Sequence, residues 1–415
     1  MTYIPLEKDL NNNALTAFGD SMNLDAFGNL RVSQGNQLFD SKFLFDKRPL
    51  FWDEVETGSG ETSTHSTTEA HVAMTTSGNN QYVIRQTKQR FTYQAGFSHV
   101  CDFTFSDFHA ESNIIKRVGY FSSATTGNYD TDFDGLFFEN DGTNISINIY
   151  KTGTEIESTN QSSWNIDKLD GTGESGITID WEKAQIAIID FQWLGVGRVR
   201  WAVNIDGVVI PIHESKHANN VDGVYMSSPN QPLRYEIRQT GAGSGSFNQI
   251  CSTVKTEGSI SRTGAVYSGN AGVNDLQLNS SGTTYAMGGI RLKTTHPDVS
   301  INLLKTSILL ETNDDLLWEW RLNPTVTGSF TYNDVTNACT QTAFGNDGAG
   351  AAPTVSGGTI VDSGYLRRNT SIDIKLDTSI GIGTEIDGTV DELVLCGTPI
   401  TNGSDAYCSF TWEEF

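Results

Sequence analysis

A regular alternation of apolar and polar side chains runs through residues 185–213. Every second residue is apolar within 186–193 and again within 198–205, which predicts two strands with one buried face each. Asp206-Gly207 follows, and this pair favours a tight hairpin turn because glycine adopts positive φ without steric cost. A third strand is expected over Val208–Ile212. Together the three predict the spine of an antiparallel β-sandwich.

The same period recurs in shorter segments along the chain. Segments 98–105, 114–121, 135–139, 145–150, 176–179 and 233–239 read as strands separated by Gly, Asp and Asn turns. A Gly- and Ser-rich stretch, 241–283, is followed by a second set over 290–292, 299–311, 316–322, 329–332, 371–376, 392–396 and 406–412. We therefore predict an all-β, antiparallel β-sandwich or jelly-roll protein.

Three parts follow from this pattern: an extended N-terminal docking arm (1–50), a jelly-roll β-sandwich (51–283) and a second, smaller β-rich domain (284–415). In the arm, apolar residues such as Phe18, Leu24 and Phe27 lack a sustained period. Such a segment becomes ordered by lying on its own domain or on a neighbouring subunit. The alternative, in which the last strands complete the first sandwich, stays open at this point.

Composition narrows the function. The 415 residues carry a net charge of −23, which argues against a nucleic-acid partner because the protein field would repel phosphates. No apolar run approaches the roughly 18 residues of a membrane span, and the N-terminus lacks the pattern of a secretory signal. Five scattered cysteines indicate reduced thiols in a protein made in a cytosol.

One acidic stretch predicts a metal site. Asp130, Asp132 and Asp134 alternate before Gly135, and Asp141 stands at the twelfth position, which fits a calcium loop with Asp in place of the closing Glu. The segment after Gly135 predicts a strand rather than the helix of an EF-hand. The alternative is a solvated acidic turn.

His213-Glu214-Ser215-Lys216-His217 matches the zinc-peptidase motif HExxH. That motif works on a helix, where both histidines lie one turn apart. Here Pro211 and the preceding strand pattern predict a strand end, on which residues four apart lie about 13 Å from each other. A strand-to-loop segment is therefore the better interpretation.

Two further motifs lack the partners that their chemistry needs. Gly19-Asp20-Ser21 resembles the nucleophile block of GDSL-type esterases, but the last histidine, His296, has no acid partner at the required spacing. Thr178-Ile179-Asp180-Trp181-Glu182 resembles the catalytic strand of laminarinase-like glycosidases with the first carboxylate replaced by Thr178. A turn and a solvated strand-to-turn segment, respectively, are expected.

Several tryptophans could form a platform for sugar stacking. Trp318 and Trp320 share one face of a predicted strand, with Glu319 on the other. Aromatic residues that alternate with polar ones usually mark the inward face of a strand. We expect these rings in the core.

A set of sequence strings resembles virion structural proteins of tailed bacteriophages. The strings are AFGNLRVSQGNQLFDSKFLF from Ala26 to Phe45, DFQWLGVGRVRW with the later DGVVIPIH and HANN, Pro232 to Ile237, Leu322 to Val326, and the closing SFTWEEF. The resemblance implies a lectin-like (concanavalin-type) jelly roll carried on an arm and present in many copies as a head, neck or tail component.

The sequence thus predicts a non-enzymatic structural component of a virion, made in the host cytoplasm, of the capsid-decoration or fibre type. Its expected partners are capsid, neck or tail proteins and sister subunits in a homo-oligomer, with a trimer left open. The main alternative is a lectin-like module that binds a host surface glycan. A depolymerase or peptidase is the third hypothesis, disfavoured because no complete catalytic set is found.

Overall fold

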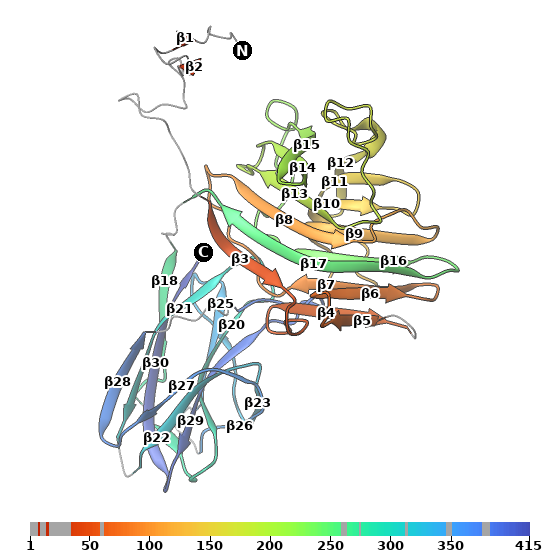
Figure 1. The fold of residues 1–415 in the computed structure, drawn as a ribbon. Helices are drawn as coiled ribbons and strands as arrows, with labels where there is room; N and C mark the ends of the chain where they lie inside the picture. Colours follow the sequence, from red (N-terminus) through yellow and green to blue (C-terminus); the bar gives the residue numbers. More distant parts are fainter. Residues whose placement is uncertain are drawn as a thin grey trace.

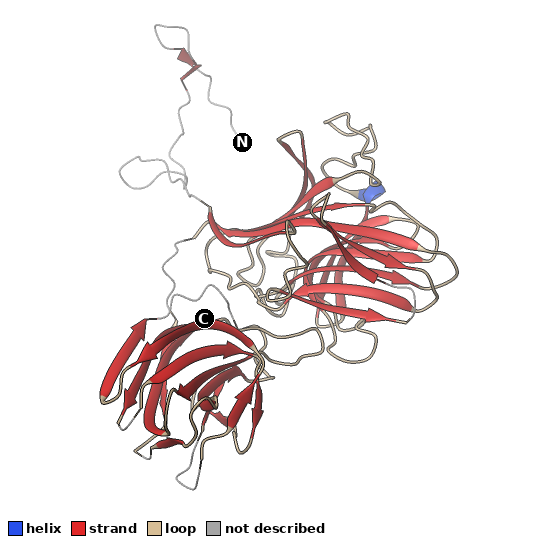
Figure 2. Cartoon of the chain, turned by 60° about the horizontal axis from the view of Figure 1, so that its bottom comes forward, coloured by secondary structure: helices blue, strands red, loops and turns tan. Residues whose placement is uncertain are grey.

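The computed structural model describes residues 35–58, 62–258, 264–273, 275–311, 314–345, 351–375 and 382–415, with two short strands, β1 (Glu7–Lys8) and β2 (Ala14–Leu15). Nearly all regular structure in these residues is β, and the one helical element is a 3₁₀ turn, η1 (Gln161–Ser163) (Figure 2). Antiparallel pairing joins the strands of every sheet. The predicted all-β, antiparallel sandwich class is confirmed.

The first sandwich consists of a seven-stranded and an eight-stranded sheet (Figure 1). The seven-stranded sheet runs, in spatial order, β12 (Thr154–Asn160), β11 (Ile145–Lys151), β10 (Asp134–Asn140), β9 (Ile114–Ser122), β16 (Leu233–Gln239), β7 (Gln81–Thr87) and β4 (Trp52–Thr57). The eight-stranded sheet runs β15 (Val208–Ser215), β14 (Val199–Ile205), β13 (Gln185–Phe191), β8 (His99–Ser106), β17 (Gly245–Thr256), β6 (His71–Thr76) and β5 (Thr62–Ser66), with β3 (Asn36–Lys42) beside β17.

The second sandwich has its own pair of sheets. The five-stranded sheet runs β18 (Ala265–Asn270), β30 (Ser404–Glu414), β21 (Ile301–Leu310) and β28 (Thr370–Lys375), with β19 (Leu276–Leu278) beside β30. The other runs β23 (Thr325–Thr327), β26 (Thr354–Ser356), β20 (Tyr285–Leu292), β29 (Glu392–Pro399), β22 (Leu316–Leu322) and β27 (Thr359–Leu366), with β25 (Thr340–Phe344) beside β20 and β24 (Asn333–Asp334) beside β25.

The predicted triple strand forms β13, β14 and β15. Ile189 pairs with Trp201, and both side chains are fully buried between the sheets. Asp206 and Gly207 have φ of 53° and 83°, the two positive values that a tight turn of this hand requires. β15 extends beyond the predicted third strand to Ser215 and therefore includes the first three residues of the HExxH motif.

Each sandwich closes around a separate apolar core. Trp201 and Tyr235 are among the large side chains of the first core, and Trp320 and Trp412 among those of the second. The strands after residue 284 therefore build a second sandwich and do not complete the first, the alternative that the sequence left open. Two details differ from the predicted limits: β3 (Asn36–Lys42) of the predicted arm belongs to the first sandwich, and β18 and β19 of the Gly- and Ser-rich stretch belong to the second.

Polar contacts join the two sandwiches. The Lys88 ammonium, just after β7, lies 2.9 Å from Glu385 and 3.4 Å from Asp391 of the second sandwich. The Ile386 amide donates to Asp53 on β4 at 2.7 Å. The side chain of Ile386 packs beside Tyr82 and Ile84. The segment that precedes β29 thus lies against the outer face of the seven-stranded sheet. Among the described residues, no helix is long and apolar enough to cross a bilayer.

Candidate functional site

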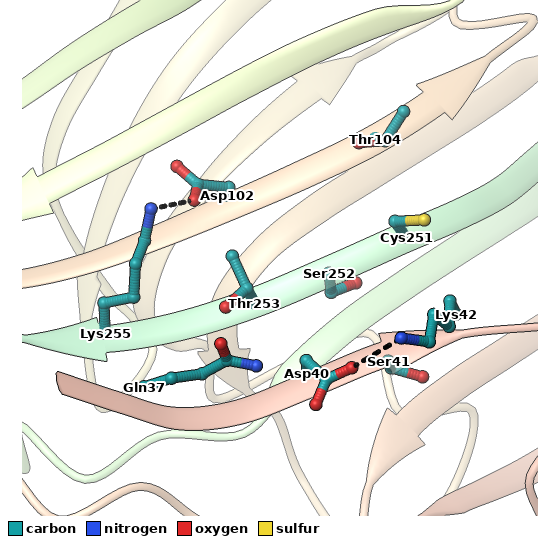
Figure 3. Close-up of a pocket in the computed structure, with 10 residues that line it drawn as sticks. All are labelled: Gln37, Asp40, Ser41, Lys42, Asp102, Thr104, Cys251, Ser252, Thr253 and Lys255. Atoms are coloured by element: carbon teal, nitrogen blue, oxygen red, sulfur yellow. Dashed lines mark ion pairs between the residues drawn. The ribbon is translucent and has the colours of Figure 1, made fainter. Parts of the chain in front are cut away.

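A hollow of about 350 Å³ lies on the outer face of the eight-stranded sheet. It forms because strands β3, β8 and β17 bury every second side chain and turn the others outward, so Asp102 and Thr104 alternate with the buried Cys101, Phe103 and Phe105. Figure 3 shows the residues that line it: Gln37, Asp40, Ser41, Lys42, Asp102, Thr104, Cys251, Ser252, Thr253 and Lys255. We call this region the outer-face hollow.

Two ion pairs lie in the outer-face hollow. Lys255 Nζ is 2.5 Å from Asp102, and Lys42 Nζ is 3.7 Å from Asp40. Half or more of the Asp40 and Lys42 side chains is exposed, so this second pair contributes little to stability and both groups stay accessible to a ligand. Burial raises the pKa of the Cys251 thiol, which disfavours the nucleophilic thiolate. The hollow can therefore bind a ligand through hydrogen bonds with carboxylates, ammonium groups, hydroxyls and an amide.

The residues of the predicted calcium loop have other partners. Asp130 pairs with Arg117 at 2.7 Å and Arg238 at 3.3 Å. Asp134 accepts hydrogen bonds from the backbone amides of Thr152, Ser227 and Ser228 and from two side chains. Asp141 accepts from two amides of its own turn, which lowers its pKa despite partial burial, and Asp132 is exposed.

No group of three or more His, Cys, Asp or Glu side chains in the described part of the chain is placed to hold a metal ion. A calcium loop needs several oxygens directed at one point, and the partners of Asp130 and Asp134 hold these two carboxylates elsewhere. The calcium assignment stays a prediction, and these contacts weigh against it.

The histidines of the HExxH motif belong to separate contacts. His213 lies on β15 with Nε2 2.8 Å from Glu157 and Nδ1 accepting from the Asn165 amide. His217 donates from Nδ1 to the Gly197 carbonyl at 2.7 Å and stacks on Tyr225, with ring centroids 4.2 Å apart. The glutamate, Glu214, is engaged by Arg198 and Lys216. The motif spans a strand end, as the sequence analysis expected.

The other two motifs give no catalytic pair. Gly19-Asp20-Ser21 lies outside the described residues. Asp180 caps a turn by accepting from the Glu182 amide, while Trp181 between them is buried and stacks on Phe105. Trp318 and Trp320 are 5% and 0% exposed and belong to the second core, so the prediction that they are not a sugar platform is confirmed.

A buried ionic cluster that was not predicted from the sequence lies on the outer face of the seven-stranded sheet. Glu236 on β16 is fully buried and accepts hydrogen bonds from Arg117, Arg234 and Arg238. Burial alone would raise the pKa of Glu236, but the three guanidinium groups outweigh it and hold that pKa far below its usual value. We call these four residues, with Glu139 and Asp130 that also pair with Arg117, the Arg–Glu cluster.

Aromatic rings extend this covered face. Phe121, Phe133 and Phe137 form a buried cluster separate from the main core, with Tyr150 against it. The guanidinium carbon of Arg117 lies 4.7 Å from the ring centre of Phe133. The outward positions of β9, β10 and β16 are therefore closed by side chains of the same domain. The alternation Arg234-x-Glu236-x-Arg238 was the sequence signal that could have revealed the cluster.

Comparisons with known proteins find only distant similarity. No family model matches the sequence, and no curated protein matches it. Among solved structures, a Bacillus licheniformis beta-glucanase is 10% identical, with 52% of this chain and 96% of that chain covered and a TM-score of 0.35. The potassium-bound Emp46p carbohydrate recognition domain is 13% identical (53% and 98% covered, TM-score 0.35). A legume lectin-like domain from Entamoeba histolytica is 10% identical (53% and 97% covered, TM-score 0.32). These values assign no activity to the chain.

Proposed function

We propose that this protein is a non-enzymatic structural component of a tailed-phage virion. In this proposal its N-terminal segment docks on the capsid, neck or tail, or on a sister subunit, and its two sandwiches project as one body. The phage setting is supported by the sequence strings quoted above. The observation that carries the structural role is the polar junction between the sandwiches.

That junction uses contacts in two places. On one side, Lys88 holds Glu385 and the buried Asp391, and the Lys88 carbonyl accepts from the Thr384 amide at 3.0 Å. On the other side, Ser300 Oγ donates to the Arg90 carbonyl at 3.1 Å and accepts from Thr92 at 3.0 Å. Contacts at separate points resist rotation of one sandwich against the other. A fixed arrangement of the two sandwiches suits a structural protein better than an enzyme that opens and closes around a substrate.

The start of the first sandwich limits how the docking segment can be tested. β3 pairs with β17 from Lys42↔Cys251 to Asn36↔Thr256, and Phe39 of β3 is buried. A deletion of residues 1–50 would therefore remove a strand of the sheet and expose core. A deletion of residues 1–34 leaves β3 intact and separates docking from folding.

The experiment compares the full chain with the 1–34 deletion. We expect both to show the same thermal unfolding, while the deletion variant loses binding to particles that lack the protein, or loses its oligomeric mass in solution. Light scattering would also report whether the intact protein is a trimer. Unchanged attachment and unchanged mass in the folded deletion variant would refute the docking role of this segment.

A second candidate, binding of a host surface glycan, is favoured by one observation. The outer-face hollow presents Asp102, Asp40, Lys255 and Thr253 on the outer face of the sheet. A sugar hydroxyl can donate to such a carboxylate and accept from such an ammonium group. We infer that a glycan, if one is bound on this sheet, lies across β3, β17 and β8.

A glycan array with and without calcium tests this candidate. Asp102→Asn and Thr253→Val should reduce binding about fivefold or more, the effect of one lost hydrogen bond. Asp190→Asn is the matched control, because Asp190 projects from the neighbouring strand β13, pairs with Arg200 and lies outside the hollow. Binding that falls equally in the control, or no binding by the wild type, would refute the assignment.

A further inference from the structure

A second cavity, of about 270 Å³, lies between the two sandwiches. We call it the junction cavity. The first sandwich contributes the ends of β7 and β9 and the segments that follow them, and the second contributes the turn after β20 and the segment before β29. The lining residues are Gln86, Arg90, Ser122, Ser123, Thr125, Thr294, Pro297, Thr384, Glu385, Ile386, Asp387 and Gly388.

Arg90 is the main feature of this cavity. Its Nη1 donates to Gln231 at 3.0 Å, whereas its Nε is buried and has no hydrogen-bond partner among the described residues. Its guanidinium makes no ion pair with a carboxylate of the described residues, although the charges of Asp298 and Asp134 act on it from nearby. Because Nε has no exposed surface, a ligand oxygen in the cavity can reach this guanidinium only through its terminal nitrogens, of which Nη1 already donates to Gln231.

The other lining groups combine donors with acceptors. Gln86 uses its side-chain oxygen to accept from Arg234, which leaves the amide NH₂ for another partner. Thr384 is buried and contributes a hydroxyl, and Glu385 and Asp387 contribute carboxylates. Lys88 pairs with Glu385 at 2.9 Å and offsets its charge, whereas no cation of the described residues forms an ion pair with Asp387. A simple anion would therefore be attracted by Arg90 but repelled chiefly by Asp387. A ligand with several hydroxyls satisfies both kinds of group, because each hydroxyl donates and accepts.

We propose that the junction cavity binds a single sugar unit, either a free monosaccharide or the terminal residue of a glycan. A sugar oxygen accepts from Arg90 and from the Gln86 amide, sugar hydroxyls donate to Glu385 and Asp387, and Pro297 covers an apolar face of the ring. The volume of about 270 Å³ lies just below the range of about 300–1,000 Å³ that is usual for small-molecule sites, which favours a ligand of one ring over an oligosaccharide. The site is independent of the docking role of the N-terminal segment.

The test uses the intact full-length protein and isothermal titration with a panel of free hexoses, N-acetylhexosamines and hexuronic acids. Inorganic phosphate serves as the anion comparator. Arg90→Gln removes the charged donor, and Thr384→Val removes a hydroxyl at nearly constant volume. Thr253→Val is the control, because it changes the outer-face hollow and leaves the junction cavity intact.

We expect at least one sugar to bind with 1:1 stoichiometry. Its affinity should fall about tenfold or more in Arg90→Gln and about fivefold in Thr384→Val, and stay unchanged in Thr253→Val. Thr384→Val keeps the proposal testable if Arg90→Gln fails to fold. The proposal would be overturned if no sugar binds, or if Arg90→Gln and Thr384→Val bind the sugar as tightly as the wild type does. Binding of phosphate with the same dependence on Arg90 would also overturn it. None of these results depends on whether residues 1–34 dock.

Discussion

Replacing Glu236 with glutamine should destabilise the first sandwich strongly. Glu236 accepts from Arg117 Nη1 at 2.5 Å, from Arg234 Nε and Nη2 at 2.8 and 2.6 Å, and from Arg238 Nε at 3.0 Å. The glutamine keeps one acceptor oxygen but removes the negative charge from a fully buried position. The size of the effect depends on which arginines keep another carboxylate.

Two of the three arginines do. Arg117 keeps Glu139 and Asp130, and Arg238 keeps Asp130 at 3.3 Å. Arg234 keeps only the neutral oxygens of Gln86 and Tyr129, so one buried guanidinium is left without a counter-charge in the described structure. Removing one partner of a buried ion pair costs about 3–5 kcal/mol. We expect a loss of this size in the free energy of unfolding of the first sandwich.

Urea unfolding, followed by tryptophan fluorescence and calorimetry, measures this loss. Calorimetry is needed because the two cores can unfold in separate transitions. Glu214→Gln is the control: Glu214 pairs with Arg198 and Lys216, which are 56% and 69% exposed, so its loss should stay below about 1 kcal/mol. A double variant that adds Arg234→Met removes the unpaired charge and should recover part of the stability.

The pH dependence gives an independent check with a fixed sign. The arginines hold the folded-state pKa of Glu236 below its unfolded value of about 4.3. The stability that this shift contributes is therefore present above that value and is lost as the pH falls toward the folded-state pKa. The difference between wild type and Glu236→Gln should stay constant from about pH 7 to 5 and shrink below about pH 4. A difference no larger than that of the control at neutral pH would refute the reasoning.

Three further variants test other parts of the structure. Lys88→Met leaves the buried Asp391 without its cation and should cost about 2–3 kcal/mol. Burial opposes the Lys88 charge, but Asp391 and Glu385 outweigh it and raise the pKa of Lys88. In alkaline thermal melts, the stability that Lys88 contributes should therefore be present below about pH 10.4 and lost as the pH rises further. Asp314 accepts from both donors of Thr401 and from the Asn402 amide, which outweigh burial and lower its pKa to about 2. Asp314→Asn should cost about 1–2 kcal/mol at neutral pH in urea unfolding, and its difference from the wild type should shrink as the pH falls from about 4 to 2. His213→Ala should cost about 1–2 kcal/mol through the lost contact with Glu157, yet leave zinc uptake in equilibrium dialysis unchanged.

Local patterns predicted the parts of the fold in which neighbours in sequence are neighbours in space. The β13–β15 triplet was predictable because two short connections join strands whose alternation is strong. The inward position of Trp318 and Trp320 followed from the same period of two. These elements need no information from distant parts of the chain.

Non-local pairing hid other elements. β17 lies wholly within the Gly- and Ser-rich stretch 241–283, yet it is central to its sheet because Phe247 and Val254 are buried between partners far away in sequence. β3 has one strongly buried apolar residue, Phe39, and is a strand only because β17 lies beside it. Weak local alternation could not reveal either role.

Candidate sites were harder to predict for a related reason. The chemistry of a carboxylate depends on what surrounds it, and the surroundings come from remote strands. The calcium prediction treated Asp130 and Asp134 as free ligands, whereas the fold brings Arg117, Arg238 and Gln231 to them. The outer-face hollow likewise needs β3, β8 and β17 side by side, and no local motif marks it.

The two outer faces of the first sandwich therefore differ in what they can bind. The face of the seven-stranded sheet is closed by the Arg–Glu cluster, by the rings around Phe137 and by Ile386 of the second sandwich. The face of the eight-stranded sheet exposes hydrogen-bonding groups, and the junction cavity is lined by Arg90, Gln86 and Asp387. The outer-face hollow and the junction cavity are thus two separate candidate places for a ligand of the first sandwich. Comparing Thr253→Val with Thr384→Val distinguishes them, since each variant alters one place and leaves the other intact.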